Sequence, residues 1–103
     1  MLTVIAEIIC HSEQDFTTVL DSFNNIREQV LKEPGCHLYD VHIDHPAVES
    51  ALHTKVPFSI MMYEKWESMQ HLETHMHSIN MQQHAQATEG TVAHVQIRIL
   101  EAQ

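Results

Sequence analysis

The order in which strand-like and helix-like patterns of apolar residues follow one another constrains this fold more than any other feature of the sequence. Residues 2–9, LTVIAEII, are almost continuously apolar and rich in β-branched side chains, which is typical of a strand covered on both faces. Residues 37–44 and 91–100 alternate as strands do, and residues 57–66 indicate a further strand. Apolar residues at helical spacing separate the first strand from the second, and the third from the fourth. The predicted order is therefore β-α-β-β-α-β.

Local signals mark where the helices begin and end. Ser12 and Ser68 are predicted N-caps, because a serine hydroxyl accepts a hydrogen bond from a free amide of the first helical turn. Pro34 and Gly35 end the first helix, since proline cannot continue it and glycine permits a tight turn. The first helix carries one apolar stripe, formed by Phe16, Val19, Leu20, Phe23, Ile26, Val30 and Leu31.

The second helical region and one connection are less sharply defined. Met69, Leu72 and Met76 follow helical spacing, and residues 79–87 are interpreted as a continuation of this helix after a bend, which Gly90 ends. Residues 45–56 are predicted to form a loop or a short helical turn between two hairpin strands.

This order of elements predicts a ferredoxin-like α+β fold over a single domain, residues 1–103, with one antiparallel sheet and its helices on one face. Val4 and Ile8 fall on one side of the first strand, whereas Ile5 and Ile9 fall on the other. Helices cover only one of these faces, and a second subunit is the simplest cover for the other. We therefore predict a homodimer in which two sheets pack together.

Charge and composition exclude several functions. The formal net charge is −9 with only five lysines and arginines, and these are scattered, so neither nucleic acid nor an anionic membrane surface is an expected partner. No apolar run approaches the roughly 20 residues of a membrane helix, and residues 1–10 lack the basic start of a signal peptide. Cys10 and Cys36 are too few for a disulfide scaffold and have no flanking cation. We expect a cytoplasmic protein with reduced, inert thiols.

Four segments together resemble the antibiotic biosynthesis monooxygenase family. They are TVIAEI at residues 3–8, EPGCHLYDV at 33–41, YEKWES at 63–68 and LETH at 72–75, and the likeness covers nearly the whole chain. The resemblance implies a dimeric α/β barrel that oxidises a small quinol-like or polycyclic aromatic substrate with O2. It also implies that the protein works without flavin, haem or metal.

The sequence departs from the family pattern at three places. CHSEQ at residues 10–14 replaces a frequent Lys-Pro-Gly turn, and the segment at 45–56 is unusual. Asn80 and Met81 occupy positions where relatives often carry an aromatic pair. The last departure leaves the substrate and the class of reaction open.

Oxygenation without a cofactor requires a base that deprotonates the substrate and a pocket that stabilises the anion. His75 is the candidate base, because imidazole titrates near neutral pH and the resemblance implies a place at the pocket. The alternative is a surface histidine on the polar face of its helix. Trp66 is predicted either to wall an aromatic ligand or to plug one end of the core. Tyr39 is a candidate hydroxyl donor or an ordinary buried strand tyrosine.

Three further residues are assigned to substrate binding. Glu64 is predicted to orient a histidine or to have a structural role, Asn80 is a weaker hydrogen-bond donor, and Met62 belongs to the pocket wall. His42 points away from Tyr39 on the same strand, so the two are not expected in one pocket. A pocket filled by methionines such as Met61, Met62, Met69 and Met76 would instead favour a non-catalytic dimeric ligand-binding or stress protein.

Metal and haem are the remaining alternatives. His71 and His75 share a helix face, but the sequence HLETH differs from the zinc motif HExxH and fixes no third ligand, so no metal site is predicted. His84 follows Trp66 much as the haem ligand does in haem-degrading relatives. Those relatives carry an asparagine in the first strand, where this chain has Ile8.

Overall fold

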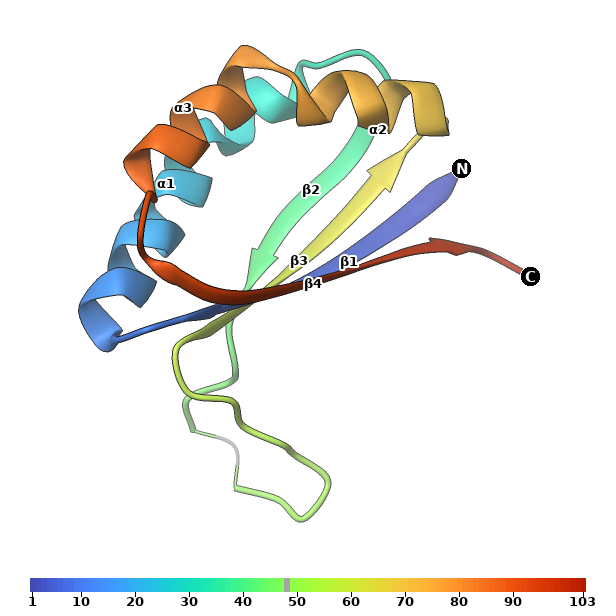
Figure 1. Ribbon diagram of the computed structural model, residues 1–103. Helices are drawn as coiled ribbons and strands as arrows, with labels where there is room; N and C mark the ends of the chain where they lie inside the picture. Colours follow the sequence, from blue (N-terminus) through green and yellow to red (C-terminus); the bar gives the residue numbers. More distant parts are fainter. Residues whose placement is uncertain (48) are drawn as a thin grey trace.

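A computed structural model describes residues 1–47 and 49–103 and shows the ferredoxin-like α+β fold. The elements in chain order are β1 (Leu2–Cys10), α1 (Glu13–Leu31), β2 (Cys36–His42), β3 (Ser59–Trp66), α2 (Met69–Met76), α3 (Ile79–Ala87) and β4 (Val92–Glu101). The strands form one antiparallel sheet in the order β2-β3-β1-β4. All three helices lie on one face of this sheet (Figure 1). The predicted architecture is confirmed, with one additional helix.

The additional helix arises because residues 69–87 form two helices, so the predicted single bent helix is wrong. Ser78 is extended and its hydroxyl accepts the Met81 amide at 3.2 Å, which starts α3 with a cap of its own. The predicted caps at Ser12 and Ser68 are confirmed, since their hydroxyls accept the amides of Asp15 and His71.

The helix-facing side of the sheet contains the core. Val4, Ala6 and Ile8 of β1 are buried there against the apolar stripe of α1, as the alternation of β1 predicts. The buried hydrophobic residues are Val4, Ala6, Ile8, Cys10, Val19, Phe23, Ile26, Val30, Tyr39, Ile60, Met62, Trp66 and Leu72. This core holds β3, and therefore Glu64, in a fixed register beneath the helices.

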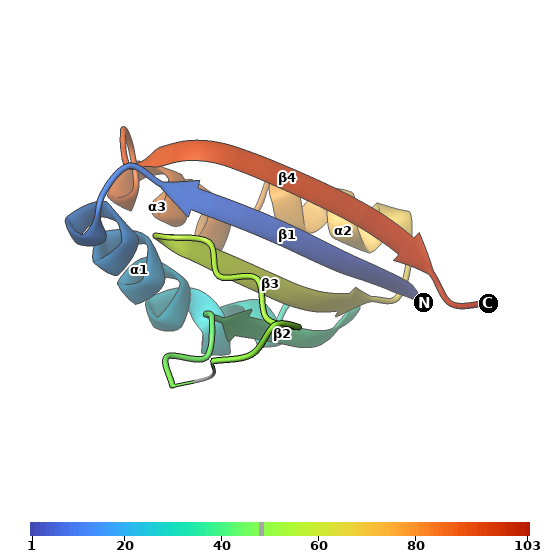
Figure 2. The same ribbon diagram turned by 90° about the horizontal axis from the view of Figure 1, so that it is seen from below.

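The connection between β2 and β3 corrects two predicted strand ends. The second strand stops at His42 rather than residue 44, because the Asp44 carboxylate instead accepts the Val56 amide at 2.8 Å across the loop. The third strand starts at Ser59 rather than residue 57, because Phe58 has a positive φ of 57°. The described residues of 45–56 form turns and irregular backbone, and residue 48 lies outside the described residues. Figure 1 shows this loop extending from the end of the sheet where β3 begins, and Figure 2 shows the four strands side by side in the order β2-β3-β1-β4.

The edge strand β4 leaves part of the helix-facing side uncovered. Val95, Ile97 and Ile99 pair with Ile8, Ala6 and Val4 of β1, so they point toward the helix layer. Their exposed fractions are nevertheless between 47% and 50%, because α1 covers β1 and β2 while none of the helices in the described residues packs closely on β4. A hollow therefore forms among β4, α2 and α3. In the part of the chain that the structure describes, no helix is long and apolar enough to span a membrane.

Candidate active site

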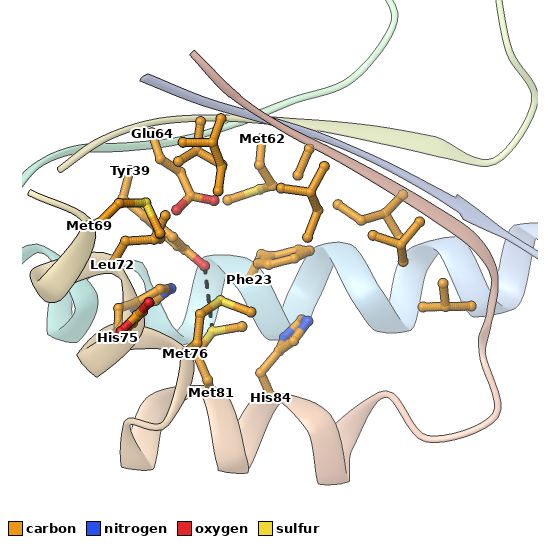
Figure 3. Close-up of a pocket in the computed structure, with 18 residues that line it drawn as sticks. Phe23, Tyr39, Met62, Glu64, Met69, Leu72, His75, Met76, Met81 and His84 are labelled. Carbon is orange, nitrogen blue, oxygen red and sulfur yellow. Dashed lines mark hydrogen bonds between the residues drawn. The ribbon is translucent and has the colours of Figure 1, made fainter. Parts of the chain in front are cut away.

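The hollow beside β4 is a cavity of about 350 Å³ with an almost wholly apolar wall (Figure 3). Its apolar lining consists of Val4, Ala6, Ile8, Phe23, Met62, Met69, Leu72, Met76, Met81, Val92, Val95, Ile97 and Ile99. Its polar lining consists of Tyr39, Glu64, Glu73, His75 and His84. An apolar cavity with a few placed polar groups is the usual form of a small-molecule site, and its size is near the lower end for such sites.

His75 enters the cavity from α2 and is held by a carboxylate from another part of the chain. Its Nδ1 lies 2.9 Å from Oε1 of Glu33, while the Asn80 amide donates to Oε2 of the same carboxylate at 2.9 Å. Since an ionised carboxylate only accepts hydrogen bonds, Nδ1 of His75 carries the ring proton and Nε2 keeps a free lone pair. Burial lowers the pKa of His75, against the opposing effect of Glu33, so the ring is neutral and can accept a proton.

Glu64 projects into the cavity from β3 and is anchored by Trp66. The indole N–H of Trp66 donates to Oε1 of Glu64 at 2.9 Å. Burial raises the pKa of Glu64 to about 7, despite this hydrogen bond, and the charge of Glu33 adds to the rise. Glu64 is therefore present in both its acid and its carboxylate form near neutral pH.

Tyr39 completes this part of the cavity from β2. Tyr39 pairs with Glu64 across the β2–β3 ladder, and its ring packs edge-on against the His75 ring with centroids 5.5 Å apart. Among the described residues, the one hydrogen-bond partner of the hydroxyl is the weakly accepting Met81 sulfur, at 3.9 Å. Burial raises the pKa of Tyr39 well above its usual value, so the group stays a neutral donor. We call Tyr39, Glu64 and His75, together with Glu33, the His75 end of the cavity.

A second histidine enters the cavity from α3. His84 has its Nδ1 2.8 Å from the hydroxyl oxygen of Ser22 on α1, and its ring packs against Phe23 with centroids 4.1 Å apart. Burial lowers the pKa of His84 to about 4, so this ring is also neutral at physiological pH. We call His84, Ser22 and Phe23 the His84 end.

The structure brings four of the six predicted site residues to the cavity wall. Tyr39, Met62, Glu64 and His75 line it. Trp66 does not line it; the indole is fully buried behind His75, with ring centroids 4.4 Å apart. Asn80 also stands behind the wall, since its amide binds Glu33.

Other histidines and methionines considered from the sequence lie elsewhere. His71 bonds Ser68 and packs against Gly35, so it does not join His75 in a common site. His42 and Met61 form a cross-strand pair in the β2–β3 ladder, and neither lines the cavity. Among residues 1–47 and 49–103, no three His, Cys, Asp or Glu side chains are grouped so that they could hold a metal ion.

The sequence patterns assign no site role to Glu33 or Ser22, the two side chains that hold the histidines of the cavity. Glu33 is indicated only as part of the turn before Cys36, and no local signal places it against a residue 42 positions away. Ser22 had a detectable signal, because it falls within the apolar stripe of α1, between Val19 and Phe23, where a polar side chain needs a partner.

Comparison with known proteins adds a family and a fold. The family model described as antibiotic biosynthesis monooxygenase matches residues 1–88. A protein of Escherichia coli strain K12 named probable quinol monooxygenase YgiN is 44% identical over 102 residues, covering 98% of this chain and 97% of its own.

Solved structures that resemble the chain are more distant in sequence. The crystal structure of PA3566 from Pseudomonas aeruginosa superimposes with a TM-score of 0.81 at 22% identity, over 99% of this chain and 93% of the other. A putative antibiotic biosynthesis monooxygenase from Nitrosomonas europaea has a TM-score of 0.79 at 14% identity, with coverages of 99% and 98%. At such identities these structures establish the shared fold alone.

Proposed function

Because the chain belongs to the antibiotic biosynthesis monooxygenase family, we propose that it is a monooxygenase that oxidises a quinol or related hydroxylated aromatic with O2. The observation that carries this proposal is the Glu33–His75 pair in the wall of an apolar cavity. It supplies a neutral base whose free nitrogen and fixed tautomer suit removal of a phenolic proton.

Deprotonation activates the substrate toward oxygen. A quinol anion gives up electrons to O2 more readily than the neutral quinol does. Nε2 of His75 takes the hydroxyl proton, and the nearby Glu33 carboxylate stabilises the imidazolium that results. The hydroxyl of Tyr39 donates to the anionic oxygen, because its bond to the Met81 sulfur is weak and easily replaced.

The reaction balances without an external reductant. One quinol and one O2 give one hydroxyquinone and one water: the ring gains one oxygen atom and loses two hydrogens. The substrate supplies all four electrons that reduce O2, two through formation of the new C–O bond and two through conversion of the quinol to the quinone. The second oxygen atom leaves as water, and Glu64, with its pKa near 7, can supply a proton to it. For this reason we propose a reaction that uses no flavin, haem or metal.

The state of the cavity also bears on the alternative of a non-catalytic binding protein. Met62, Met69 and Met76 line the cavity rather than fill it, and Met61 is not part of the wall. An open cavity with a poised base favours the enzyme.

We also propose that the protein is a homodimer formed through the helix-free face of the sheet. Ile5 and Ile9 are only partly buried there, on the side of β1 opposite to Val4 and Ile8. Light scattering after size-exclusion chromatography is expected to give twice the 11.9 kDa chain mass, whereas a mass equal to one chain would contradict this arrangement.

The test of the proposed function is O2 consumption by chelator-treated protein with a panel of quinols and polyhydroxylated aromatics. We expect His75→Gln to lower turnover about 10²–10⁴-fold, the usual contribution of a general base. His77→Gln is the matched control, because His77 lies just beyond the same helix and is exposed. Labelled O2 should place one labelled atom in the product.

Two outcomes would contradict the proposal. Equal turnover by His75→Gln and the wild type would remove His75 as the base. Absence of turnover with the whole panel, together with a Soret band on haem titration that His84→Ala abolishes, would instead favour the haem-binding alternative.

A further inference from the structure

The polar groups of the cavity are divided between two separate ends. Figure 3 shows His84 apart from Tyr39, Glu64 and His75, with the side chains of Met76 and Met81 between them. The His75 end accounts for one reacting oxygen of a substrate. It leaves unexplained why a second buried histidine faces the same apolar space.

The partner of each histidine determines what its free nitrogen offers to a ligand. At the His75 end, a carboxylate requires the proton on Nδ1, so Nε2 accepts. At the His84 end, the partner is the Ser22 hydroxyl, which has no other hydrogen-bond partner among the described residues. A hydroxyl that donates to Nδ1 of His84 leaves the ring proton on Nε2. Nε2 of His84 is not fully buried without a partner. In the described part of the chain, the only side-chain nitrogen or oxygen atom in that situation is Nδ1 of His53.

The two ends are reached from different elements of the fold. Met81 receives the Tyr39 hydroxyl, and His84 follows Met81 by three residues on α3, so His84 enters the cavity roughly one helical turn further along this helix. Phe23 packs on the His84 ring and restricts its orientation.

We propose that His84, oriented by Ser22, is a specificity-determining residue that donates a hydrogen bond from Nε2 to the second oxygen of an aromatic ligand bearing oxygens at both ends. The position of the first oxygen, at the His75 end, rests on the proposed function. Both the hydroxyl oxygen of a quinol and the carbonyl oxygen of a quinone can accept from an N–H donor, so the same group can orient substrate and product. The ligand class is accordingly an aromatic with two oxygens, a quinol or its quinone, rather than a simple phenol.

The test measures binding without oxygen and therefore without turnover. Anaerobic calorimetric titrations compare naphthohydroquinone, which has two oxygens, with α-naphthol, which lacks one. We expect the wild type to bind naphthohydroquinone about 3–10-fold more tightly, the usual effect of one neutral hydrogen bond. We expect His84→Phe to abolish this preference while its affinity for α-naphthol stays within about twofold. His94→Phe is the matched control, because His94 is exposed on β4 and does not line the cavity.

A second variant keeps the test decisive if His84→Phe does not fold. Ser22→Ala removes the hydroxyl that fixes the tautomer, and it is expected to reduce the preference without changing α-naphthol binding. An unchanged preference in the folded variant, or no preference in the wild type, would overturn the subsite while leaving the O2-consumption result intact. If the variants lose the preference while the wild type consumes no O2, the subsite is supported and the proposed monooxygenase reaction is rejected.

Discussion

His75 and His84 line one cavity from consecutive helices, yet their surroundings give them opposite chemical properties. Both rings are buried, and burial lowers both pKa values. His75 faces a carboxylate that opposes this effect, whereas His84 faces a hydroxyl that does not. The comparison teaches that the partner on Nδ1, rather than burial, decides whether the other nitrogen accepts or donates.

The same comparison applies to the neighbouring side chains. The His75 end contains Glu33, Glu64 and Tyr39, so it can move protons and stabilise charge. The His84 end contains Ser22 and Phe23, so it can only bind and orient. A ligand that spans the cavity would therefore react at one end and be recognised at the other.

The largest expected effect comes from making the two histidines alike. In Glu33→Gln the side-chain amide can donate to Nδ1 of His75, which moves the ring proton to Nε2 and removes the acceptor. We expect turnover to fall about 10²–10⁴-fold, as when a triad aspartate is replaced by its amide. Steady-state kinetics of O2 consumption measures it.

Glu73→Gln is the control for this change, because Glu73 is an exposed acid on α2 at the same cavity. Turnover by Glu33→Gln equal to that of Glu73→Gln would show that the tautomer of His75 does not matter.

A smaller effect should appear in the pH dependence of stability, with opposite signs at the two ends. Glu64 has a raised pKa, so it favours the folded state below pH 4.5, and this contribution is lost as the pH rises toward about 7. His84 has a lowered pKa, so it favours the folded state above pH 6.5, and this contribution is lost as the pH falls toward about 4. Each amounts to about 3 kcal/mol, and between pH 4.5 and 6.5 the two slopes oppose each other.

Two variants separate these slopes in urea unfolding measured at several pH values. His84→Phe is expected to lose stability as the pH rises from 4.5 to 7, and Glu64→Gln as the pH falls from 6.5 to 4. Parallel curves for the two variants would contradict the assignment of opposite environments.

The smallest effect concerns the turn that presents Glu33 to His75. Gly35 has a φ of 79°, and a Cβ at this position would overlap the His71 ring. Gly90 has a φ of 77° with no atom near its Cβ position. Gly35→Ala should therefore cost about 2 kcal/mol or more, and Gly90→Ala only the backbone penalty of about 1 kcal/mol.

Thermal and urea unfolding of both glycine variants provide the measurement. Because the Gly35 turn carries Glu33, turnover should fall in Gly35→Ala and not in Gly90→Ala. Equal stability losses would mean that the approach of His71 to the turn has no energetic role.

Much of the fold was determined by local sequence. The alternation in β1, the stripe of α1 and the serine caps of α1 and α2 depend on residues at most a few positions apart, and all are confirmed. The bounds of β3 and the separate helix α3 were not predicted correctly. They depend on the positive φ of Phe58 and on the cap at Ser78, which compete with an otherwise continuous apolar pattern.

The sequence by itself thus determined the order of the elements and the faces that they bury, and it offered His75, Tyr39 and Glu64 as candidates for one site. Only the tertiary structure decided their chemistry. Glu33 meets His75 across 42 residues, and Ser22 meets His84 across 62. Periodicity reports which side of an element is buried, but a proton's position depends on the atom at hydrogen-bond distance, and that atom is supplied by a distant segment once the core has packed.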